Sequence, residues 1–474
     1  MLARVAFVLA APFGGGDWDI YSTVAENILR GCGVSLSPPD SGLCIPHFGG
    51  NHLPGYPAFV ASIWLISGHS DMAIRFAQLL LYGAALGRLT LVVRRYTGSD
   101  AAALAVGLVI ALSPLQVAWP RYTQTETLSL AASVWFFAEI LASFAEGRLR
   151  AVPIGLAVLA ATFIRLDGIL LCVPVAVAAF MLHPPLDAIR RGSVAALIVV
   201  LPIAGWTVRN VIVGVPVMPA PMVLPNNAPP PYGYLAWGNT WLSQEYQRAG
   251  WGFGVTRFNY DSIRIDNKAF DSLEEKQRVM GWLAELAKYK GKPFPPEIDA
   301  KFAELARERA ARAPVRTYVV LPMERAAILW GNPFSSFGWP NELPSSVGDQ
   351  QRLEASRNAG GLMTLARQYP VRALSKAFTA SYRAILEILF VSILLVSFGG
   401  QLSDFRRVVW VVTAWLAART AFLAVVDAFE TRYMAPAAPA MELVVVVGCL
   451  ILMGRRGRFG LRPIQTPATA PSAS

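Results

Sequence analysis

The chain has 474 residues, of which 54% are hydrophobic and 15% are charged, and its mean hydropathy is +0.43. These values lie outside the range of an ordinary soluble domain and indicate an all-α polytopic membrane protein. The formal net charge of +11 does not indicate nucleic-acid binding, because much of the basic excess forms short clusters beside apolar segments, as the positive-inside rule predicts.

The first apolar segment, Met1 to Pro12, has only about twelve residues, whereas about twenty are needed to cross a bilayer. Either the first membrane helix is short and continues through Phe13, or the true start lies upstream. A cleaved signal peptide is poorly supported, because Pro12 and a glycine run stand where a small-x-small cleavage site is expected.

The next segment, residues 17–72, is predicted to form an outer loop that lies on the membrane. It opens with Asp17 and Asp19, and the apolar spacing from Asp17 to Arg30 predicts an amphipathic helix on the membrane surface. Cys32 and Cys44 share this loop. They could form a disulfide if the loop faces an oxidising compartment, and the alternative is two unpaired small residues.

The segment from Leu53 to Ser67 decides the topology. If it lies in the interface as a second juxtamembrane helix, every arginine cluster falls on the cytoplasmic side. With that choice we expect about ten crossings with both chain ends in the cytoplasm. After the first, they run from Ala73 to Arg94, Ala101 to Trp119, Leu128 to Phe144, Ala151 to Ile164, Ile169 to Leu182, Val194 to Val213, Ala384 to Gly399, Val408 to Val426 and Met434 to Met453.

These elements predict four regions: an N-terminal membrane module at 1–213, a periplasmic loop region at 214–382, C-terminal membrane helices at 383–455 and a cytoplasmic tail at 456–474. Within the loop region, we expect helices at about 271–290 and 296–313. The charged residues of the second helix are expected to form a solvated face, and they are Glu297, Asp299, Lys301, Glu304, Arg307 and Arg309.

The outer loops gather acids and arginines on one side of the membrane. A group transfer from a lipid phosphate to a hydroxyl needs a carboxylate base and cations that stabilise the departing phosphate. Asp17 or Asp19 can serve as the base. The cations are drawn from Arg75, Arg121, Arg165 and Arg432, although each arginine alone could be a helix-end anchor that reaches the interface.

Motifs for other chemistries are absent from the sequence. It contains no GxxxxGK[ST] phosphate loop, no HExxH and no GxSxG, and its four histidines are scattered. No cofactor is certain. Asp17 and Asp19 could hold a divalent metal together with a pyrophosphate or sugar phosphate, but two carboxylates alone predict no resident metal.

The order of these features resembles the GT-C superfamily of membrane glycosyltransferases. It is similar to the branch of protein O-mannosyltransferases and of aminoarabinose and galacturonic acid transferases of lipopolysaccharide, often grouped as glycosyltransferase family 39. The matching segments are DWDIYSTVAENILRG, NHLPGYPAFVASIWLISG, AIRFAQLLLYG, RRYTG, SPLQVAWPRYTQTETL and ETRYMAPAAPA. Each motif is short, so the specificity lies in their order, and the loop at 214–382 shows no match.

The resemblance implies a polyprenyl-phosphate-linked sugar donor and inverting transfer to a glycan, lipid or protein hydroxyl. It further implies a bacterial inner membrane and an active site at the periplasmic face. It assigns the catalytic role to Asp17, with Asp19 as second candidate, and adds Glu126, Tyr433 and the arginines to the site. Where many relatives read Lys-Pro-Pro, this chain has His52-Leu53-Pro54, so His52 is expected to replace the lysine's phosphate contact only in part.

The alternative function is a membrane transporter or lipid flippase, which would need polar groups buried at mid-membrane. Most charges fall near the predicted helix ends. The exceptions are Arg4, Arg88 and Arg419.

Overall fold

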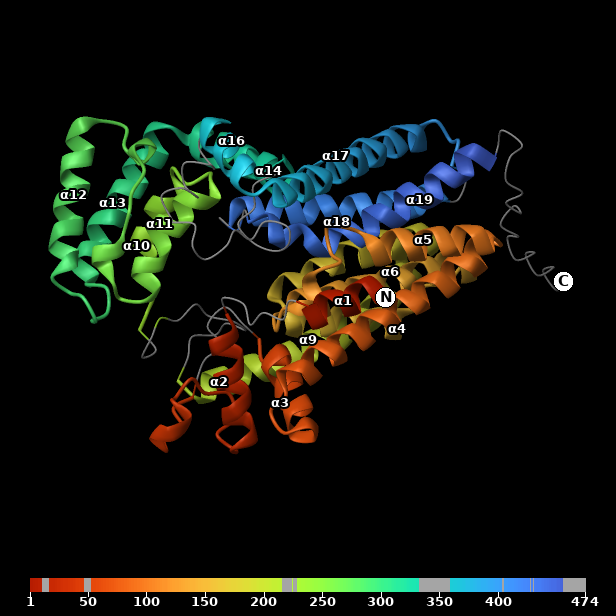
Figure 1. Cartoon of the computed structure of the whole chain (residues 1–474), viewed down its shortest axis with the longest axis horizontal. Coiled ribbons are helices and arrows are strands. Elements are labelled where there is room, and N and C mark those ends of the chain that lie inside the picture. The colour runs from red at the N-terminus through yellow and green to blue at the C-terminus, as the bar shows by residue number, and fades with distance from the viewer. Residues whose placement is uncertain are drawn as a thin grey trace. The chain divides into compact units, whose positions relative to one another are not determined.

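The chain is described by a computed structural model covering residues 1–10, 17–46, 53–214, 224, 228–331, 359–402, 405–426, 428 and 430–454. Over these residues the structure consists of helices and their connections, without a strand, which confirms the all-α prediction (Figure 1). The chain divides into two compact units. Unit 1 comprises 1–221, 379–419 and 435–474, and unit 2 comprises 222–378 and 420–434.

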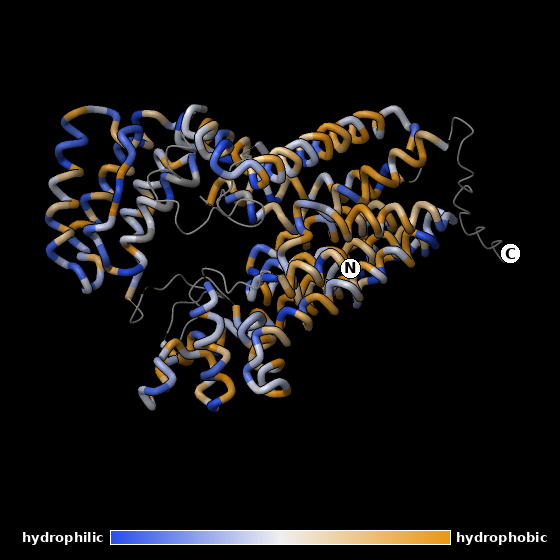
Figure 2. Tube along the Cα trace, viewed as in Figure 1, coloured by the Kyte–Doolittle hydropathy of each residue, from blue (hydrophilic) through white to orange (hydrophobic). Residues whose placement is uncertain are grey.

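Unit 1 contains the apolar helices apart from residues 370–378 and 420–425, which belong to unit 2, and Figure 2 shows these helices as mainly hydrophobic along their length. Within the described residues, six helical segments are long and apolar enough to cross a membrane, and four shorter apolar helices accompany them. The chain is therefore a multi-pass membrane protein. The helices are α1 (Leu2–Ala10), α2 (Trp18–Leu29), α3 (Gly55–Ser67), α4 (Asp71–Thr97), α5 (Asp100–Leu112), α6 (Glu126–Glu146), α7 (Ala151–Ile164), α8 (Cys172–Leu182), α9 (Pro185–Ile212), α17 (Pro370–Phe398), α18 (Phe405–Val425) and α19 (Ala438–Gly454).

The ends of α4 and α5 follow from local sequence signals. The hydroxyl of Ser70 accepts a hydrogen bond from the N–H of Ala73 at the start of α4, and Ser99 caps α5 in the same way. Gly98 ends α4 with a φ of 67°, a conformation that glycine adopts without strain. The predicted helix from Ala101 to Trp119 is too long, because the structure ends it at Leu112. Ser113 precedes Pro114, and a residue before proline is disfavoured in the helical conformation.

The helix α6 is the central element of unit 1. In the most apolar 18-residue stretch of α6, 89% of the residues are buried inside the protein, whereas the corresponding share for α9 is 17%. It packs against α4 and α7. Because α6 begins at Glu126, this central packing fixes the position of a predicted site residue.

Unit 2 is built around aromatic side chains from α10 (Tyr232–Asn239), α11 (Glu245–Thr256), α12 (Leu273–Ala287) and α13 (Pro296–Arg312). The Tyr234 ring stacks on Trp251 with centroids 5.0 Å apart, and Phe302 meets Tyr234 edge-on. Further helical segments of the unit are the π-helical turn Arg316–Val320, α14 (Leu321–Gly331) and α16 (Ala359–Gln368). Figure 2 shows a closer mixture of hydrophilic and hydrophobic residues in α10 to α13 than in the membrane helices.

The two helices predicted in the loop region are confirmed as α12 and α13, but the solvated face expected on α13 is partly wrong. Arg309 is only 2% exposed, and its guanidinium pairs with Glu275 and Asp271. Asp299 accepts hydrogen bonds from the N–H groups of Gly233 (3.1 Å) and Tyr234 (2.8 Å) at the start of α10. Both residues carry charge at helical spacing, and only the packing of a second helix determines that they face inward.

Candidate functional site

The first outer loop is anchored by an aromatic cluster. Tyr21 of α2 meets Tyr56 of α3 at a centroid distance of 4.8 Å, and Trp18 meets Trp64 at 5.8 Å. Ile74 of α4 and Leu128 of α6 complete the same buried cluster. The helix α2 is therefore held at the end of α4 that carries Arg75 and at the end of α6 that carries Glu126.

Asp17 and Asp19 lie at the N-terminus of α2. Asp17 is the residue before the helix, is half-buried and makes no side-chain cap, while Asp19 is exposed in the first turn. Negative charge is favoured at a helix N-terminus. The two carboxylates are thus on a fixed element at the surface of the aromatic cluster.

A disulfide joins Cys32 and Cys44, whose Cα atoms are 5.1 Å apart. The buried side chain of Asn27 donates to the carbonyls of Ser35 and Ser37, each at 2.9 Å. These contacts connect the segment after α2 to the helix. The pairing left open by the sequence is therefore made in the structure.

Arg75, near the start of α4, is connected to Arg121 of the second outer loop. Arg75, only 7% exposed, donates from Nε to the carbonyl of Arg121 at 2.9 Å. The guanidinium of Arg121 lies over the Tyr122 ring, 4.7 Å from its centroid. Gln78 donates to the carbonyl of Tyr122 at 3.0 Å and accepts from the Tyr56 hydroxyl at 3.1 Å. One turn of α4 thus connects the first and second outer loops.

Arg165 lies in a cluster of charged side chains with little exposure. Its guanidinium is 3.3 Å from Glu126 and 3.4 Å from Asp167. Arg419 of α18 pairs with the second oxygen of Asp167 at 2.8 Å. The second carboxylate oxygen of Glu126 is buried without a hydrogen-bond partner among the described residues. This unpaired oxygen is an acceptor available to a ligand hydroxyl.

Arg432 and Tyr433 belong to unit 2. Arg432 pairs with Glu430 at 2.7 Å and lies over the Tyr433 ring, 5.2 Å from its centroid. Glu430 also pairs with Arg248 at 3.4 Å. Asp17, Asp19, Arg75, Arg121, Glu126 and Arg165 all lie in unit 1, where a hydrogen bond joins Arg75 to Arg121 and an ion pair joins Arg165 to Glu126, whereas Arg432 and Tyr433 lie in unit 2. His52 lies outside the described residues.

Sequence reasoning gave no site role to Gln78 or Arg419. Gln78 is one turn after Arg75 and interrupts an apolar stretch of α4, and Arg419 interrupts the apolar run of α18. A polar group inside a membrane helix is a signal for function or pairing, so both could have been found by that rule. Within the described residues, no three His, Cys, Asp or Glu side chains gather as metal ligands.

Comparison with known families gives a match over residues 51–206, to the model described as dolichyl-phosphate-mannose-protein mannosyltransferase. This segment includes Arg75, Arg121, Glu126 and Arg165 but not the aspartates of α2 or the Arg432 region. The resemblance to membrane glycosyltransferases is thus confirmed over the N-terminal membrane helices.

Two solved structures also resemble the chain. One is ArnT from Cupriavidus metallidurans in the apo state, at 15% identity and a TM-score of 0.38. The other is the same protein bound to undecaprenyl phosphate, at 14% identity and a TM-score of 0.37. In both cases 94% of this chain and 76% of that chain are covered. A comparison with curated proteins finds no match.

Proposed function

We propose that this protein is a bacterial inner-membrane glycosyltransferase. It moves a sugar from a polyprenyl-phosphate donor to an acceptor hydroxyl at the periplasmic face, with inversion at the sugar. The observation that carries the proposal is the aromatic cluster that joins α2 to α4 and α6. It holds the Asp17 helix at the ends of the helices that carry Arg75 and Glu126. The family that matches residues 51–206 is named for a lipid-phosphate-linked mannose donor, which supports the donor class.

In this mechanism Asp17 takes the proton of the acceptor hydroxyl as the hydroxyl oxygen attacks the anomeric carbon, with Asp19 as the second candidate base. The bond from that carbon to the phosphate oxygen breaks, and the departing phosphate gains negative charge. Arg75, Arg121 and Arg165 are the unit 1 cations that stabilise this charge, and Arg432 and Tyr433 are the unit 2 candidates. The unpaired oxygen of Glu126 can accept a hydrogen bond from a sugar hydroxyl.

The disulfide between Cys32 and Cys44 supports the orientation. Structural disulfides form in the periplasm and other oxidising compartments and are rare in the cytosol. A first loop outside the cytoplasmic membrane is consistent with the positive-inside distribution of the arginine clusters.

Within the described residues we find no support for a transporter or lipid flippase, because the three arginines that lie away from the predicted helix ends have partners. Arg4 donates to the Tyr82 hydroxyl and to backbone carbonyls, Arg88 pairs with Glu139 at 2.8 Å, and Arg419 pairs with Asp167. The partners of these arginines satisfy their charges inside the protein, as buried charges require.

The test is transfer from a panel of radiolabelled polyprenyl-phosphate sugars in native membranes. We expect transfer with the wild type and loss of at least about a thousandfold with Asp17→Asn, because the variant cannot accept the proton. Asp40→Asn is the matched control, since it changes an exposed aspartate in the same loop. Retained activity in both Asp17→Asn and Asp19→Asn would overturn the assignment of the base. Absence of transfer from every donor would count against glycosyl transfer, and the next experiment would then measure transport of a substrate across the membrane as a flux.

A further inference from the structure

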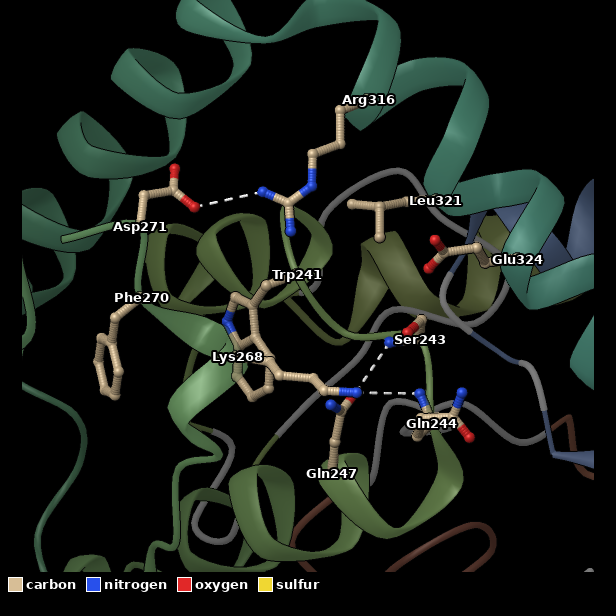
Figure 3. Close-up of a pocket in the computed structure, with 10 residues that line it drawn as sticks. All are labelled: Trp241, Ser243, Gln244, Gln247, Lys268, Phe270, Asp271, Arg316, Leu321 and Glu324. Carbon is tan, nitrogen blue, oxygen red and sulfur yellow. Dashed lines mark hydrogen bonds and ion pairs between the residues drawn. The ribbon is translucent and has the colours of Figure 1, made fainter. Parts of the chain in front are cut away.

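Buried glutamines hold turns of this chain through their side-chain amides. In unit 2, the side-chain oxygen of Gln247 accepts hydrogen bonds from the N–H groups of Ser243 and Gln244, each at 3.0 Å, at the start of α11 (Figure 3). In unit 1, the fully buried Gln116 lies in the second outer loop, residues 113–125, which joins α5 to α6. Its side chain contacts α4 and α19, so the loop is tied to two membrane helices.

The side-chain amide of Gln116 is hydrogen-bonded on both sides. Its oxygen accepts from the hydroxyl of Tyr82 in α4 at 2.7 Å, and its NH₂ group donates to Oε2 of Glu442 in α19, also at 2.7 Å. The other carboxylate oxygen of Glu442 accepts from the hydroxyl of Tyr382 in α17 at 2.8 Å. Because an amide oxygen only accepts and an NH₂ group only donates, Tyr82 and Glu442 together fix the orientation of the amide.

Arg4 of α1 binds the same loop from another helix. Its guanidinium donates to the carbonyls of Ile110 and Ala111 in the last turn of α5, at 2.9 and 3.1 Å, and to the carbonyl of Gln116 at 2.8 Å. It also donates to the Tyr82 hydroxyl at 3.0 Å. Because this hydroxyl accepts from Arg4, its own proton is donated to the Gln116 oxygen.

The backbone from Gln116 to Tyr122 is a series of hydrogen-bonded turns. The N–H of Trp119 donates to the carbonyl of Gln116 at 3.3 Å, and the N–H of Tyr122 donates to the carbonyl of Trp119 at 3.0 Å. Arg121, a candidate ligand of the donor phosphate, lies within these turns. A displacement of Gln116 is therefore passed along the turns to Arg121.

The helices α4 and α19 hold the loop at separate points. Arg75, Gln78 and Tyr82 recur at helical spacing along α4, and each donates a hydrogen bond to the loop. Glu442 comes from α19, 326 residues after Gln116 in the chain, and it is fully buried. An ionisable side chain is costly inside a membrane helix and is a signal for function.

We propose that Glu442 is a positioning residue of the glycosyltransferase. Its carboxylate orients the Gln116 amide and thereby holds the second outer loop, and with it Arg121, in place at the donor phosphate. The effect on transfer rests on the proposed function, whereas the hold of Glu442 on the loop can be measured without any substrate.

The test exchanges the two side chains. In Glu442→Gln, the new amide keeps the Tyr382 hydrogen bond through its oxygen, but its NH₂ group then faces the NH₂ group of Gln116. Turning the Gln116 amide over would instead bring its NH₂ group against the Tyr82 proton. The double variant Gln116→Glu/Glu442→Gln restores the three hydrogen bonds, because the carboxylate at position 116 accepts from both Tyr82 and the amide at position 442.

The first readout is hydrogen–deuterium exchange of the full chain in lipid nanodiscs, without substrate. In Glu442→Gln we expect the backbone amides of residues 113–122 to exchange about tenfold faster than in the wild type, because the loop opens more often. The double variant should return to the wild-type rate. Tyr382→Phe, which removes one hydrogen bond to Glu442, is a milder variant and should change the exchange in the same direction.

The second readout is kcat/KM for the polyprenyl-phosphate sugar donor. We expect it to fall about tenfold in Glu442→Gln, because a displaced Arg121 meets the phosphate poorly, and to recover in the double variant. Glu139→Gln is the matched control. Glu139 is also a buried carboxylate of a membrane helix with two arginine partners, but it lies about 20 Å along α6 from Glu126. Its loss should lower the thermal unfolding midpoint and leave loop exchange and kcat/KM unchanged.

The outcomes separate positioning from general stability. Unchanged exchange at 113–122 in both Glu442→Gln and Tyr382→Phe, a double variant that restores nothing, or an equal effect of Glu139→Gln would each overturn the proposal. Faster loop exchange with an unchanged kcat/KM would overturn the positioning role as well. The expected loop exchange in a protein that transfers sugar from no donor would count against the proposed function, and it would support the hold of Glu442 on the loop.

Discussion

At the scale of single residues, two buried carboxylates of unit 1 each share their charge between two arginines. Glu139 is 2% exposed and contacts both Arg88 at 2.8 Å and Arg150 at 2.7 Å. Asp167 is shared between Arg165 and Arg419. Each carboxylate therefore neutralises cations from two different segments, and its loss would remove two ion pairs at once.

Asp167→Asn should destabilise the protein strongly. The substitution removes the carboxylate charge that pairs with Arg419, itself 2% exposed, at 2.8 Å, and breaking a buried pair in this way costs about 3–5 kcal/mol. We expect a clearly lower thermal unfolding midpoint in detergent. Asp187→Asn, at an exposed position in α9, should leave the midpoint unchanged, and equal midpoints for the two variants would contradict the role of the buried pair.

Asp271 should make unit 2 sensitive to acid. Burial by itself raises the pKa of Asp271, but the guanidinium groups of Arg309, Arg312 and Arg316 hold the pKa below its ordinary value. Because the pKa is lower in the folded than in the unfolded chain, the stabilisation is complete above the unfolded pKa and is lost as the pH falls through the folded pKa.

This pH dependence can be measured as the urea midpoint at pH 6 and at pH 3. The wild type should lose more stability between the two than Asp271→Asn, in which the position no longer titrates. Equal losses in both proteins would show that other carboxyl groups account for the acid sensitivity.

At the scale of elements, the close approach of α3 to α7 determines the position of the second half of the first outer loop. The helix α3 begins at Gly55, where an added methyl group would lie 2.6 Å from the carbonyl carbon of Phe163 in α7. No carbon atoms approach so closely without a shift of the backbone. The absence of a side chain at this position therefore lets the second half of the outer loop sit against the membrane helices.

Gly55→Ala should consequently separate α3 from α7 and destabilise the protein by about 1–3 kcal/mol. Transfer should fall as well, because α3 carries the Tyr56 and Trp64 contacts that hold α2. Gly87→Ala is the control, since nothing lies within 4 Å of the added methyl group in α4, and alanine is the better helix former there. A Gly55→Ala protein as stable and active as Gly87→Ala would refute the close-packing role.

At the scale of the whole molecule, the residues that the sequence predicts for the site are divided between the two units. The Asp17 helix and three arginines belong to unit 1, whereas Arg432 and Tyr433 belong to unit 2. The helix α17 runs through both, since residues 370–378 belong to unit 2 and the rest to unit 1.

The orientation of the molecule can be tested through the disulfide of the first loop. In native bacterial membranes, we expect Cys32 and Cys44 to resist alkylation until a reductant is added, because the periplasm keeps such pairs oxidised. Cys172 and Cys449, which are free in the structure, provide the comparison after denaturation. Alkylation of Cys32 and Cys44 without reductant would place the loop in a reducing compartment and contradict the proposed periplasmic site.

Hydrophobic runs and charge clusters by themselves determined that this is an all-α membrane protein, because a bilayer demands long apolar helices and admits few charges. The same rules located most membrane helices, and the order of short polar motifs indicated a glycosyltransferase. Only the tertiary structure decided which polar residues meet. Arg309 faces inward because Asp271 and Glu275 lie opposite it. Arg419 pairs with Asp167, which is more than two hundred residues away in the chain, and Cys32 forms a disulfide with Cys44. Such pairings depend on contacts between distant segments, which the periodicity of one helix does not encode.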